Sequence, residues 1–453
     1  MSEELISVGL DIGTTSTQLV VSKLQVQNVS GSFSVPKMQI TRREILYKSP
    51  VHFTPLLNES LVDAQKLKEI VQQEYRLAGI TRQEVDTGAV IITGETSRKE
   101  NAKAVLSALS AFAGQFVVST AGPDLESVLA AKGAGATKYS EQTGKTLLHM
   151  DIGGGTSNLC LIQKGEIVAT GCLNVGGRLV KTEQGVLTYV SPVLKPLFDL
   201  QVGQRVSESQ LEEVANMLTQ ALEMAAGFRP PTALLQQLTT EGTFMEIPVE
   251  PVMLSFSGGV ADCIQTVHDT GAFGDMGPVL GQSIGKSRLC KAPYRLGEET
   301  IRATVIGAGC HSTQLSGSTV FYRNTPFPQK DIPVAVARQE IWELPAEEMK
   351  AWWEQKKKQW DKECLLFLEG PLPHSYEKIR LLGESLAKAG ATMVAMEQDI
   401  AKALGQNIAL HLAKDAPCLC MDGLHLGEEN FLDVGAPVGP ALPVVVKMLI
   451  FGK

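Results

Sequence analysis

The sequence predicts a mixed α/β protein, with two related halves followed by a C-terminal α/β region. The first observation is a pattern that occurs twice, at residues 8–21 and again at 148–162: apolar strand, Asp, Gly-rich turn, apolar strand. The second is an alternation of strand-like and amphipathic helical segments along the rest of the chain. The third is a change of composition beyond residue 320, where all four tryptophans lie between Trp342 and Trp360. We therefore expect three domains, over residues 1–147, 148–320 and 321–453.

The totals fit a globular protein of two or three domains. The chain has 453 residues, of which 44% are hydrophobic and 20% charged, so it can bury a sizeable core. Its net charge of −8 and the lack of a long basic run argue against a dedicated nucleic-acid-binding protein. The first residues carry acids and run directly into a strand, so we expect no secretory signal. No apolar run is long enough for a bilayer, so we expect no membrane span.

Each copy of the repeated pattern has the chemistry of a phosphate-binding hairpin. The first copy contains Asp11 with Gly13, Thr14 and Thr15, and the second contains Asp151 with Gly153, Gly154, Gly155 and Thr156. Glycines leave the turn bare, so phosphate oxygens can approach backbone N–H groups. An Asp at the end of the first strand can hold a hydrated Mg²⁺, which prefers oxygen ligands. Two such hairpins predict two related half-domains that face one nucleotide.

Hydrophobic periodicity and turn residues predict the other elements of the first half. We expect hairpin strands at 5–12 and 17–24, an antiparallel meander over 25–47, a helix over 61–78, a strand at 89–92, a helix over 98–112 and a strand at 116–118. Gly79 would cap the helix over 61–78. Residues 122–136 are almost wholly small, which predicts a helix that packs tightly against another helix. The same stretch can also serve as a hinge between lobes.

The second half contains two further glycine clusters. A strand at 166–172 leads to Gly176 and Gly177, which can place backbone near a phosphate or form an ordinary turn. A strand at 251–255 leads to Ser257, Gly258 and Gly259. We expect helices over 207–226 and 262–268, loops over the Gly- and Pro-rich residues 270–296, and a helix over 298–308 with small residues on one face.

The C-terminal region alternates strands and helices. A charged helix over 345–362 carries most of the tryptophans, which can form core or a docking surface for a partner. We then expect strands at 364–368, 392–395, 418–421 and 444–451, and helices over 375–389 and 398–412. The eight cysteines show no metal-type spacing, and we interpret them as reduced core residues.

These motifs, in this order, resemble the superfamily of actin, the heat-shock chaperones and the sugar kinases. The resemblance implies two actin-like (ribonuclease H-like) ATPase lobes with a hinged nucleotide cleft, plus a C-terminal α/β domain. The Asp11 and Asp151 loops would be the two phosphate loops, and Ser257, Gly258 and Gly259 would contact adenosine. Gly176 and Gly177 would approach the phosphates. The helices over 122–136 and 298–309 would be the two connecting helices that cross at the hinge.

The whole chain is similar to one branch of that superfamily, the reactivating factors for adenosylcobalamin-dependent ethanolamine ammonia-lyase. Residues 91–102, 150–158, 173–178 and 431–447 carry this resemblance. It implies an ATPase that frees the lyase of damaged cobalamin so that adenosylcobalamin can rebind. The lyase would be the partner, and the protein would be cytoplasmic or associated with a bacterial microcompartment. Asp422 and His425 lack the spacing with which a histidine replaces the base ligand of cobalamin, so we expect no tightly held coenzyme.

The resemblance also implies roles for single residues. Asp11 and Asp151 would orient Mg²⁺, mostly through water, while Thr14, Thr15 and Thr156 would donate hydrogen bonds to the phosphates of ATP. Phosphoryl transfer needs positioning and charge neutralisation, and an acid must align the attacking water. Glu126, at the start of the first connecting helix, is the first candidate for that acid. Glu95 is the second, with a surface carboxylate as its alternative.

Two other functions remain open at this stage. A small-molecule kinase of the same fold would need a general base opposite the γ-phosphate, and no Asp occurs in a matching context. An actin-like scaffold ATPase is the other alternative, because the sequence leaves the oligomeric state open.

Overall fold

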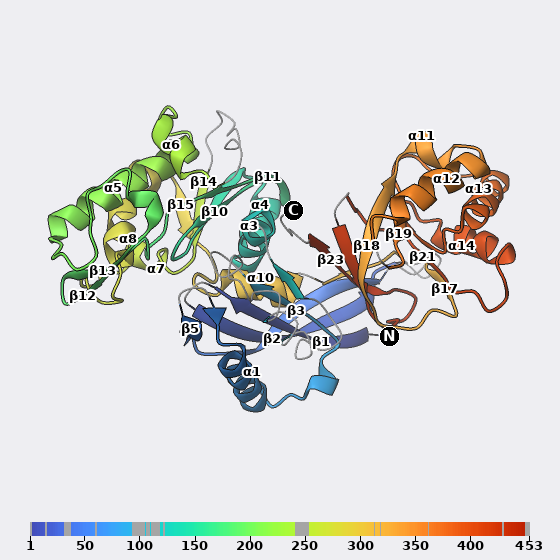
Figure 1. Ribbon diagram of the computed structural model, residues 1–453, viewed down its shortest axis with the longest axis horizontal. Coiled ribbons are helices and arrows are strands. Elements are labelled where there is room, and N and C mark those ends of the chain that lie inside the picture. The colour runs from blue at the N-terminus through green and yellow to red at the C-terminus, as the bar shows by residue number, and fades with distance from the viewer. Residues whose placement is uncertain are drawn as a thin grey trace.

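The computed structural model describes residues 2–13, 16–30, 38–58, 61–92, 105, 109, 118–120, 123–240, 253–311, 313–317, 319–360, 362–427 and 430–448. Every structural statement below concerns these residues. They form a mixed α/β structure, as predicted, with three large β-sheets and helices packed on them. Figure 1 shows the first sheet in blue at the lower centre, the second in teal to yellow to its left, and the third in orange and red on the right.

The first sheet has the strand order β3-β2-β1-β7-β8, with β4 paired to β2. Its strands are β1 (Ser2–Ile12), β2 (Ser16–Asn28), β3 (Met38–Lys48), β4 (His52–Phe53), β7 (Thr87–Ile92) and β8 (Val118–Thr120). The predicted hairpin and meander are confirmed, because β1, β2 and β3 pair antiparallel, while β7 lies parallel to β1. The small ladder β5 (Leu56–Asn58) and β6 (Leu61–Val62) precedes helix α1 (Ala64–Ala78), which ends at the predicted Gly79. The predicted helix over 98–112 lies largely outside the described residues.

The second sheet repeats the first in strand order and direction. Its order is β11-β10-β9-β14-β15, in which β9, β10 and β11 pair antiparallel and β14 lies parallel to β9. The strands are β9 (Leu147–Ile152), β10 (Ser157–Gln163), β11 (Glu166–Leu173), β14 (Met253–Ser257) and β15 (Tyr294–Leu296). The short hairpin of β12 (Val180–Glu183) and β13 (Val186–Val190) leads to α5 (Glu208–Ala225) and α6 (Ala233–Leu238). The repeated Asp-containing pattern is therefore the central hairpin of two sheets with one topology.

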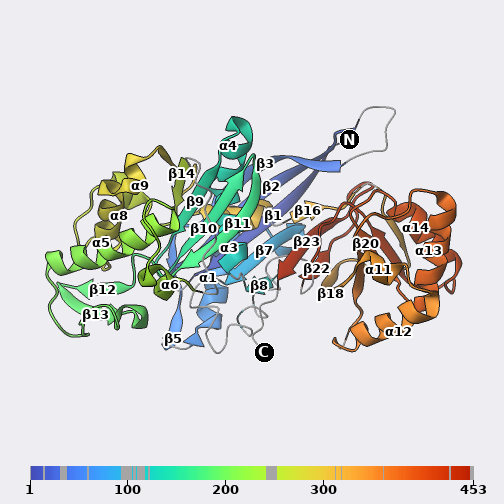
Figure 2. The same cartoon turned by 90° about the horizontal axis from the view of Figure 1, so that it is seen from above.

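Helices α3 (Pro123–Gly133) and α10 (Ala303–His311) lie between the first two sheets, and α4 (Ala136–Thr143) follows α3 against the second sheet (Figure 2). The small residues predict the close packing correctly, because a Cβ on Gly307 of α10 would overlap the Leu129 carbonyl of α3. The helix predicted over 122–136 is confirmed by α3 but was predicted too long at its C-terminal end. Gly135 adopts a φ of 72°, which breaks the chain into α3 and α4. The helix predicted over 298–308 begins only at Ala303.

The prediction of loops over 270–296 is also wrong. This segment contains α8 (Gly277–Lys286), α9 (Arg288–Lys291) and strand β15. Its glycines at 277, 281 and 285 are four apart, so they form one face of α8. That face lies against α7 (Asp262–Gln265), where a Cβ on Gly281 would overlap Cys263. These glycines allow close helix packing here and do not mark a loop.

The third sheet contains the last part of the chain. Its order is β16-β23-β22-β18-β19-β20-β21-β17. Its strands are β16 (Thr313–Leu315), β17 (Phe321–Arg323), β18 (Gln329–Ala337), β19 (Leu365–Leu368), β20 (Met393–Met396), β21 (Cys418–Met421), β22 (Asn430–Val434) and β23 (Pro443–Met448). Strands β18 to β21 are parallel, as strand–helix alternation predicts, whereas β22, β23 and β17 pair antiparallel.

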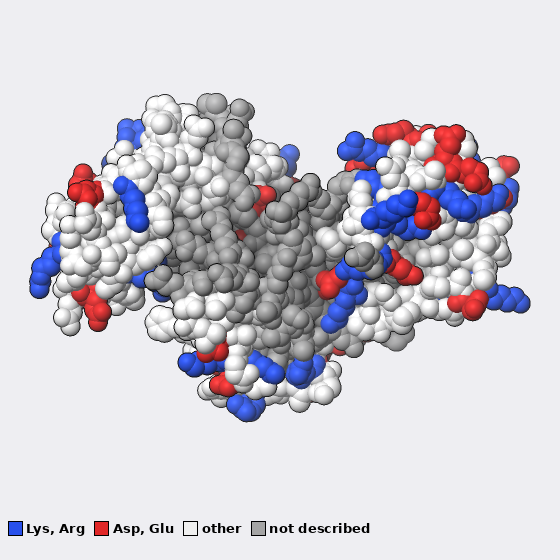
Figure 3. Space-filling view, viewed as in Figure 1, with Lys and Arg blue, Asp and Glu red and all other residues white. Residues whose placement is uncertain are grey.

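Helices cover the parallel strands of the third sheet on one face. They are α11 (Gln339–Trp342), α12 (Ala346–Lys357), α13 (Tyr376–Ala389) and α14 (Ala401–Leu410). Their outer surface carries many charged side chains of both signs, at the upper right of Figure 3. Trp342 and Trp353 are buried in the core beneath them, and Trp352 and Trp360 pack against that core. The core interpretation of the tryptophans is confirmed, but α12 ends before Trp360, so the predicted helix over 345–362 is too long.

Candidate functional site

The first Gly-rich turn is closed by short backbone hydrogen bonds. In the β1–β2 hairpin the N–H of Gly13 donates to the carbonyl of Ser16 at 2.8 Å, and Asp11 lies opposite Gln18. Thr54, which follows β4, donates its hydroxyl hydrogen to the Gly13 carbonyl at 2.8 Å. Asp11 is half-buried at the end of its strand. The predicted site residues Thr14, Thr15 and Glu95 lie outside the described residues.

The second turn has the same construction. The N–H of Gly153 donates to the carbonyl of Thr156 at 2.9 Å, and Asp151 lies opposite Asn158 across the β9–β10 hairpin. A Cβ placed on Gly155 would meet no atom within 4 Å, so the tip of the loop faces open space. Such a tip can present backbone N–H groups to an anion.

Asp151 is buried and receives hydrogen bonds from two elements. The hydroxyl of Ser257, at the end of β14, donates to Oδ1, and that of Thr304, in α10, donates to Oδ2 at 3.5 Å. Burial raises the pKa of Asp151 to about 6, although both hydroxyls favour the ionised form. The second carboxylate of the site is therefore held by the neighbouring strand and by α10.

A buried histidine extends this network. His149 lies two residues before Asp151, with Nε2 at 2.9 Å from the Ser257 hydroxyl and Nδ1 at 3.1 Å from the Ser255 hydroxyl. Burial and the nearby Arg295 lower the pKa of His149 to about 3, so the ring is neutral. The sequence analysis missed His149, Ser255 and Thr304. The signal for His149 and Ser255 was the period-two spacing of polar residues in two otherwise apolar strands, whereas Thr304 lies in helix α10 and had no such signal.

The segment that contains the glycine pair at 176–177 packs against the second turn. The N–H of Gly177 donates to the Gly153 carbonyl at 3.0 Å, and the N–H of Arg178 donates to the Gly154 carbonyl at 2.6 Å. These two N–H groups are thus used within the protein. This segment therefore fixes the shape of the second Gly-rich turn.

The Ser257 loop differs from its predicted role in one respect. The Ser257 side chain is fully buried on Asp151 and His149, so its hydroxyl is already engaged. Gly258 donates its N–H to the Thr300 carbonyl at 3.0 Å. Gly259 has only the Ile301 side chain within 4 Å of a built Cβ, at 3.8 Å, so the open part of this loop is Gly259.

Helix α10 and the residues before it join the two hairpins. Ser7 of β1 donates its hydroxyl hydrogen to the Gly309 carbonyl of α10 at 2.5 Å, while Thr304 of the same helix contacts Asp151. Ahead of the helix, Gln18 donates to the Ile301 carbonyl at 3.1 Å. Arg302 donates to the Ser49 carbonyl at 3.1 Å, and Lys48 pairs with Glu299. Both hairpins of the predicted site therefore contact α10 or the residues just before it.

The described residues fit a nucleotide phosphate with a hydrated cation. Gln18 and Asn158, opposite the two Asp residues, each have a buried amide oxygen without a donor among the described residues. Such oxygens can accept hydrogen bonds from the water of a bound cation. Glu126 lies half-buried in the first turn of α3. A separate open pocket of about 680 Å³, lined by residues 189–190 and 195–202, involves none of the twin-loop residues.

Two other features bear on the class of protein. All eight cysteines are free thiols and seven of them are buried, as predicted for reduced core residues. Within the described part of the chain, helices with the length and apolar character of a membrane span are absent.

The family model and the full-length relatives indicate the same family. The family model described as ethanolamine utilisation protein EutA matches residues 3–452. Proteins named ethanolamine ammonia-lyase reactivase EutA, from Salmonella typhimurium and Escherichia coli, are each 35% identical over 99% of this chain and 99% of their own length. Among solved structures, ethanolamine utilization protein EutJ from Carboxydothermus hydrogenoformans matches 67% of this chain and 89% of its own. Its identity is 17% and its TM-score is 0.35, so we draw nothing from that likeness. The family match and the two full-length relatives place the chain in the ethanolamine utilisation protein EutA family.

Proposed function

We propose that the chain is an ATP-dependent reactivating factor for ethanolamine ammonia-lyase, which releases damaged cobalamin so that adenosylcobalamin can rebind. The observation that carries this proposal is the likeness to two proteins named as reactivases, over 99% of both chains. It extends through the third sheet, so it covers more than the nucleotide loops. Neither the kinase nor the scaffold alternative has a comparable observation in its favour.

The twin loops support the ATP part of the proposal. Asp11 and Asp151 would hold hydrated Mg²⁺, and the bare turns at Gly13 and at Gly153, Gly154 and Gly155 would cradle the phosphates. Thr14, Thr15 and Thr156 would donate hydroxyl hydrogens. Bound Mg²⁺ neutralises phosphate charge, and Glu126 or Glu95 would orient a water. Gly259, with Gly258, would face the adenosine.

The arrangement of sheets supports a two-lobed mechanism. Residues 1–147 and 148–320 would form lobes around the nucleotide, and 321–453 a domain specific to the reactivases. Helices α3 and α10 cross between the first two sheets. A movement of either phosphate loop would therefore shift the packing of these two helices. We propose that opening and closing about this crossing loosens the partner enzyme around its cobalamin.

The test is a reactivation assay. Ethanolamine ammonia-lyase inactivated with cyanocobalamin is incubated with the purified chain, Mg²⁺, ATP and adenosylcobalamin, and deamination is measured. We expect activity to return only when ATP and the chain are both present. If the chain hydrolyses ATP but does not restore deamination, the proposal that ethanolamine ammonia-lyase is its partner would be refuted. If the chain does not hydrolyse ATP, the proposed ATPase activity would be refuted.

Carboxylate variants test the site within the same assay. Asp11→Ala and Asp151→Ala should each lower ATP turnover by about a hundredfold or more, because the cation loses a ligand contact. Asp269→Ala removes an exposed carboxylate from a loop away from the hairpins and should leave turnover unchanged. Full activity in both site variants would contradict the metal assignment.

A further inference from the structure

Arg178 is a cationic residue that lies against the second Gly-rich loop. Its backbone N–H donates to the Gly154 carbonyl at 2.6 Å, and its side chain turns back over the same glycine. A Cβ built on Gly154 would lie 3.2 Å from Cδ of Arg178. The arginine therefore covers the middle glycine of the loop with both its backbone and its side chain.

The guanidinium of Arg178 is held in place by the carboxylate of Asp275. Oδ2 of Asp275 accepts from Nε of Arg178 at 3.1 Å, and Oδ1 of Asp275 accepts from the N–H of Gly277 at 2.8 Å. Asp275 is buried, with 6% of its surface exposed, and lies just before α8. Both oxygens of Asp275 are thus engaged, and α8 anchors the carboxylate that orients the arginine.

This geometry leaves the outer side of the guanidinium available. Only Nε bonds to Asp275, and among the described residues the terminal nitrogens Nη1 and Nη2 have no hydrogen-bond partner. The side chain is 28% exposed, so a ligand can reach it. A guanidinium whose two terminal nitrogens are available can donate two parallel hydrogen bonds to a pair of phosphate oxygens.

We propose that Arg178 contacts the nucleotide, with its guanidinium on the phosphate oxygens held by the loop at 153–156. It would neutralise phosphate charge, and Asp275 would act as its positioning residue. The inference rests on the proposed nucleotide site and adds a residue to it. A purely structural Arg178–Asp275 ion pair is the alternative that the experiment must separate.

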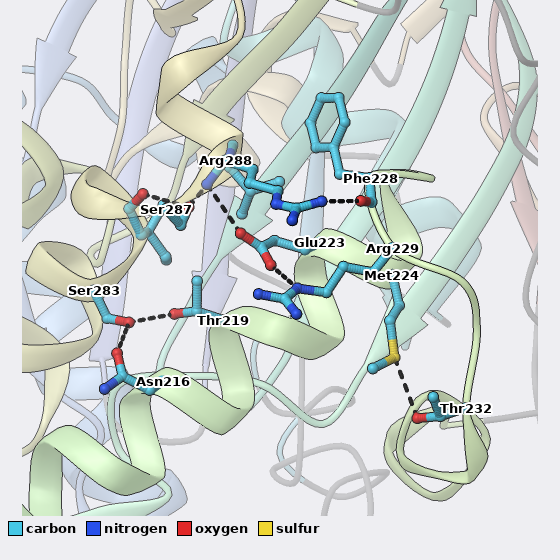
Figure 4. A network of polar contacts seen from close by, with 12 residues as sticks. Asn216, Thr219, Glu223, Met224, Phe228, Arg229, Thr232, Ser283, Ser287 and Arg288 are labelled. Atoms are coloured by element: carbon cyan, nitrogen blue, oxygen red, sulfur yellow. Dashed lines mark hydrogen bonds and ion pairs between the residues drawn. The ribbon is translucent and has the colours of Figure 1, made fainter.

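The chain contains a matched pair for that comparison. Nε of Arg229 pairs with the buried Glu223 of α5, whose other oxygen accepts from the N–H of Arg288 at 2.9 Å (Figure 4). This pair repeats the Arg178–Asp275 arrangement, with one carboxylate shared between a guanidinium and a backbone N–H. It lies among α5, α6 and α9, and none of its contacts involves the Gly-rich loops.

The experiment is calorimetric titration of the full chain with ATP, ADP and adenosine in the presence of Mg²⁺. Arg178→Ala should weaken ATP and ADP binding about tenfold or more, the size of one lost charge-assisted hydrogen bond, and leave adenosine binding unchanged. Arg178→Lys should recover part of the loss, because a single ammonium keeps the charge without the fork. Arg229→Ala should bind all three ligands like the wild type.

The opposing outcomes are distinct. Wild-type affinity of Arg178→Ala for ATP and ADP would overturn the proposal, and so would an equal loss for adenosine, which lacks phosphate. If Arg178→Ala does not fold, Arg178→Gln, which can still hydrogen-bond Asp275, gives the same comparison. A wild-type chain that binds no nucleotide would instead refute the proposed function itself and the inference with it.

Discussion

Donor and acceptor bookkeeping fixes each proton around Asp151. An ionised carboxylate only accepts, so Ser257 must donate to it. The Ser257 oxygen then accepts from His149, whose ring must carry its proton on Nε2, since that nitrogen faces Ser257. Nδ1 is left as an acceptor for the Ser255 hydroxyl. All three hydrogen bonds therefore run toward the carboxylate, and together they favour its charged form.

Removing Ser257 should disturb both stability and metal use. Ser257→Ala leaves the His149 N–H without its acceptor and Asp151 without its nearest donor, so we expect a loss of about 1–3 kcal/mol in unfolding free energy. ATP turnover should require a higher Mg²⁺ concentration, because Asp151 is less firmly held. Denaturant unfolding and a Mg²⁺ titration measure the two effects. Ser255→Ala, which removes a hydrogen bond to His149 and none to Asp151, should show the smaller change in Mg²⁺ dependence. Equal Mg²⁺ curves for Ser257→Ala and wild type would contradict this account.

The sequence was more informative about the loop residues than about the residues that support them. The Asp and Gly residues of both turns follow from local chemistry, and the structure forms both turns as predicted hairpins. The supports of Asp151 depend on the register of β9 against β14 and on the placement of α10. A single sequence contains no signal for that register, so the contact of Ser257 with Asp151 was not predicted; its adenosine role came from the family resemblance.

At the level of elements, the crossing of α3 and α10 depends on the absence of side chains. Gly133 of α3 lies against the Ala303 carbonyl, and Gly307 of α10 lies against the Leu129 carbonyl. Each helix thus presents a glycine to the backbone of the other. Apolar side chains would hold the two axes further apart, and Thr304 would then no longer reach Asp151.

Gly307→Ala should therefore destabilise the protein by about 1–3 kcal/mol, because the added methyl group overlaps a carbonyl that cannot move alone. Thermal unfolding measures the loss. Gly271→Ala is the control, since a Cβ there meets no atom within 4 Å, and we expect it to change stability by less than about 0.5 kcal/mol. Equal melting temperatures for the two variants would show that the helices separate at little cost.

Glycine also explains where prediction of elements failed. In residues 122–136 the glycines were taken as part of one helix, yet Gly135 has a left-handed φ and ends it. In residues 270–296 the glycines were taken as loop, yet Gly277, Gly281 and Gly285 form one packed face of α8. The same residue type has opposite effects in the two segments. What decides is a tertiary contact, which local sequence does not encode.

On the scale of the whole molecule, the repeated motif predicted more than a pair of loops. The first two sheets share one strand order and one set of directions, so the two halves are topologically equivalent. The third sheet was only half predicted. Its parallel strands follow from strand–helix alternation, but β16, β22 and β23 are added from distant segments as antiparallel neighbours. Such long-range pairing has no local signature.

Buried ionisable groups lie in several parts of the molecule, and their contributions to the pH dependence of the unfolding free energy have opposite signs. Burial lowers the pKa of His149 and of His311 to about 3, so folding disfavours their protonation. Burial raises the pKa of Asp151 and of Asp422, so folding disfavours their ionisation. Acidification from neutral pH therefore lowers the unfolding free energy through the histidines and raises it through the aspartates. The unfolding free energy of the whole protein should therefore vary less with pH than the histidines alone or the aspartates alone would make it vary.

Asp422→Asn isolates one side of this balance. Asp422 is fully buried, and burial, followed by the effect of neighbouring Asp399, raises its pKa. Well below the ordinary aspartate pKa of 3.8, the folded and unfolded wild type both hold the proton and there is no penalty; the penalty grows as pH rises from there to the raised folded pKa of about 6, and then stays constant. The unfolding free energy of Asp422→Asn relative to wild type should thus increase by about 1–3 kcal/mol between pH 4 and pH 8, measured by denaturant unfolding. Asp415→Asn, at an exposed position, should show a constant difference. A difference for Asp422→Asn that is also constant across this range would mean that the buried carboxyl carries no such cost.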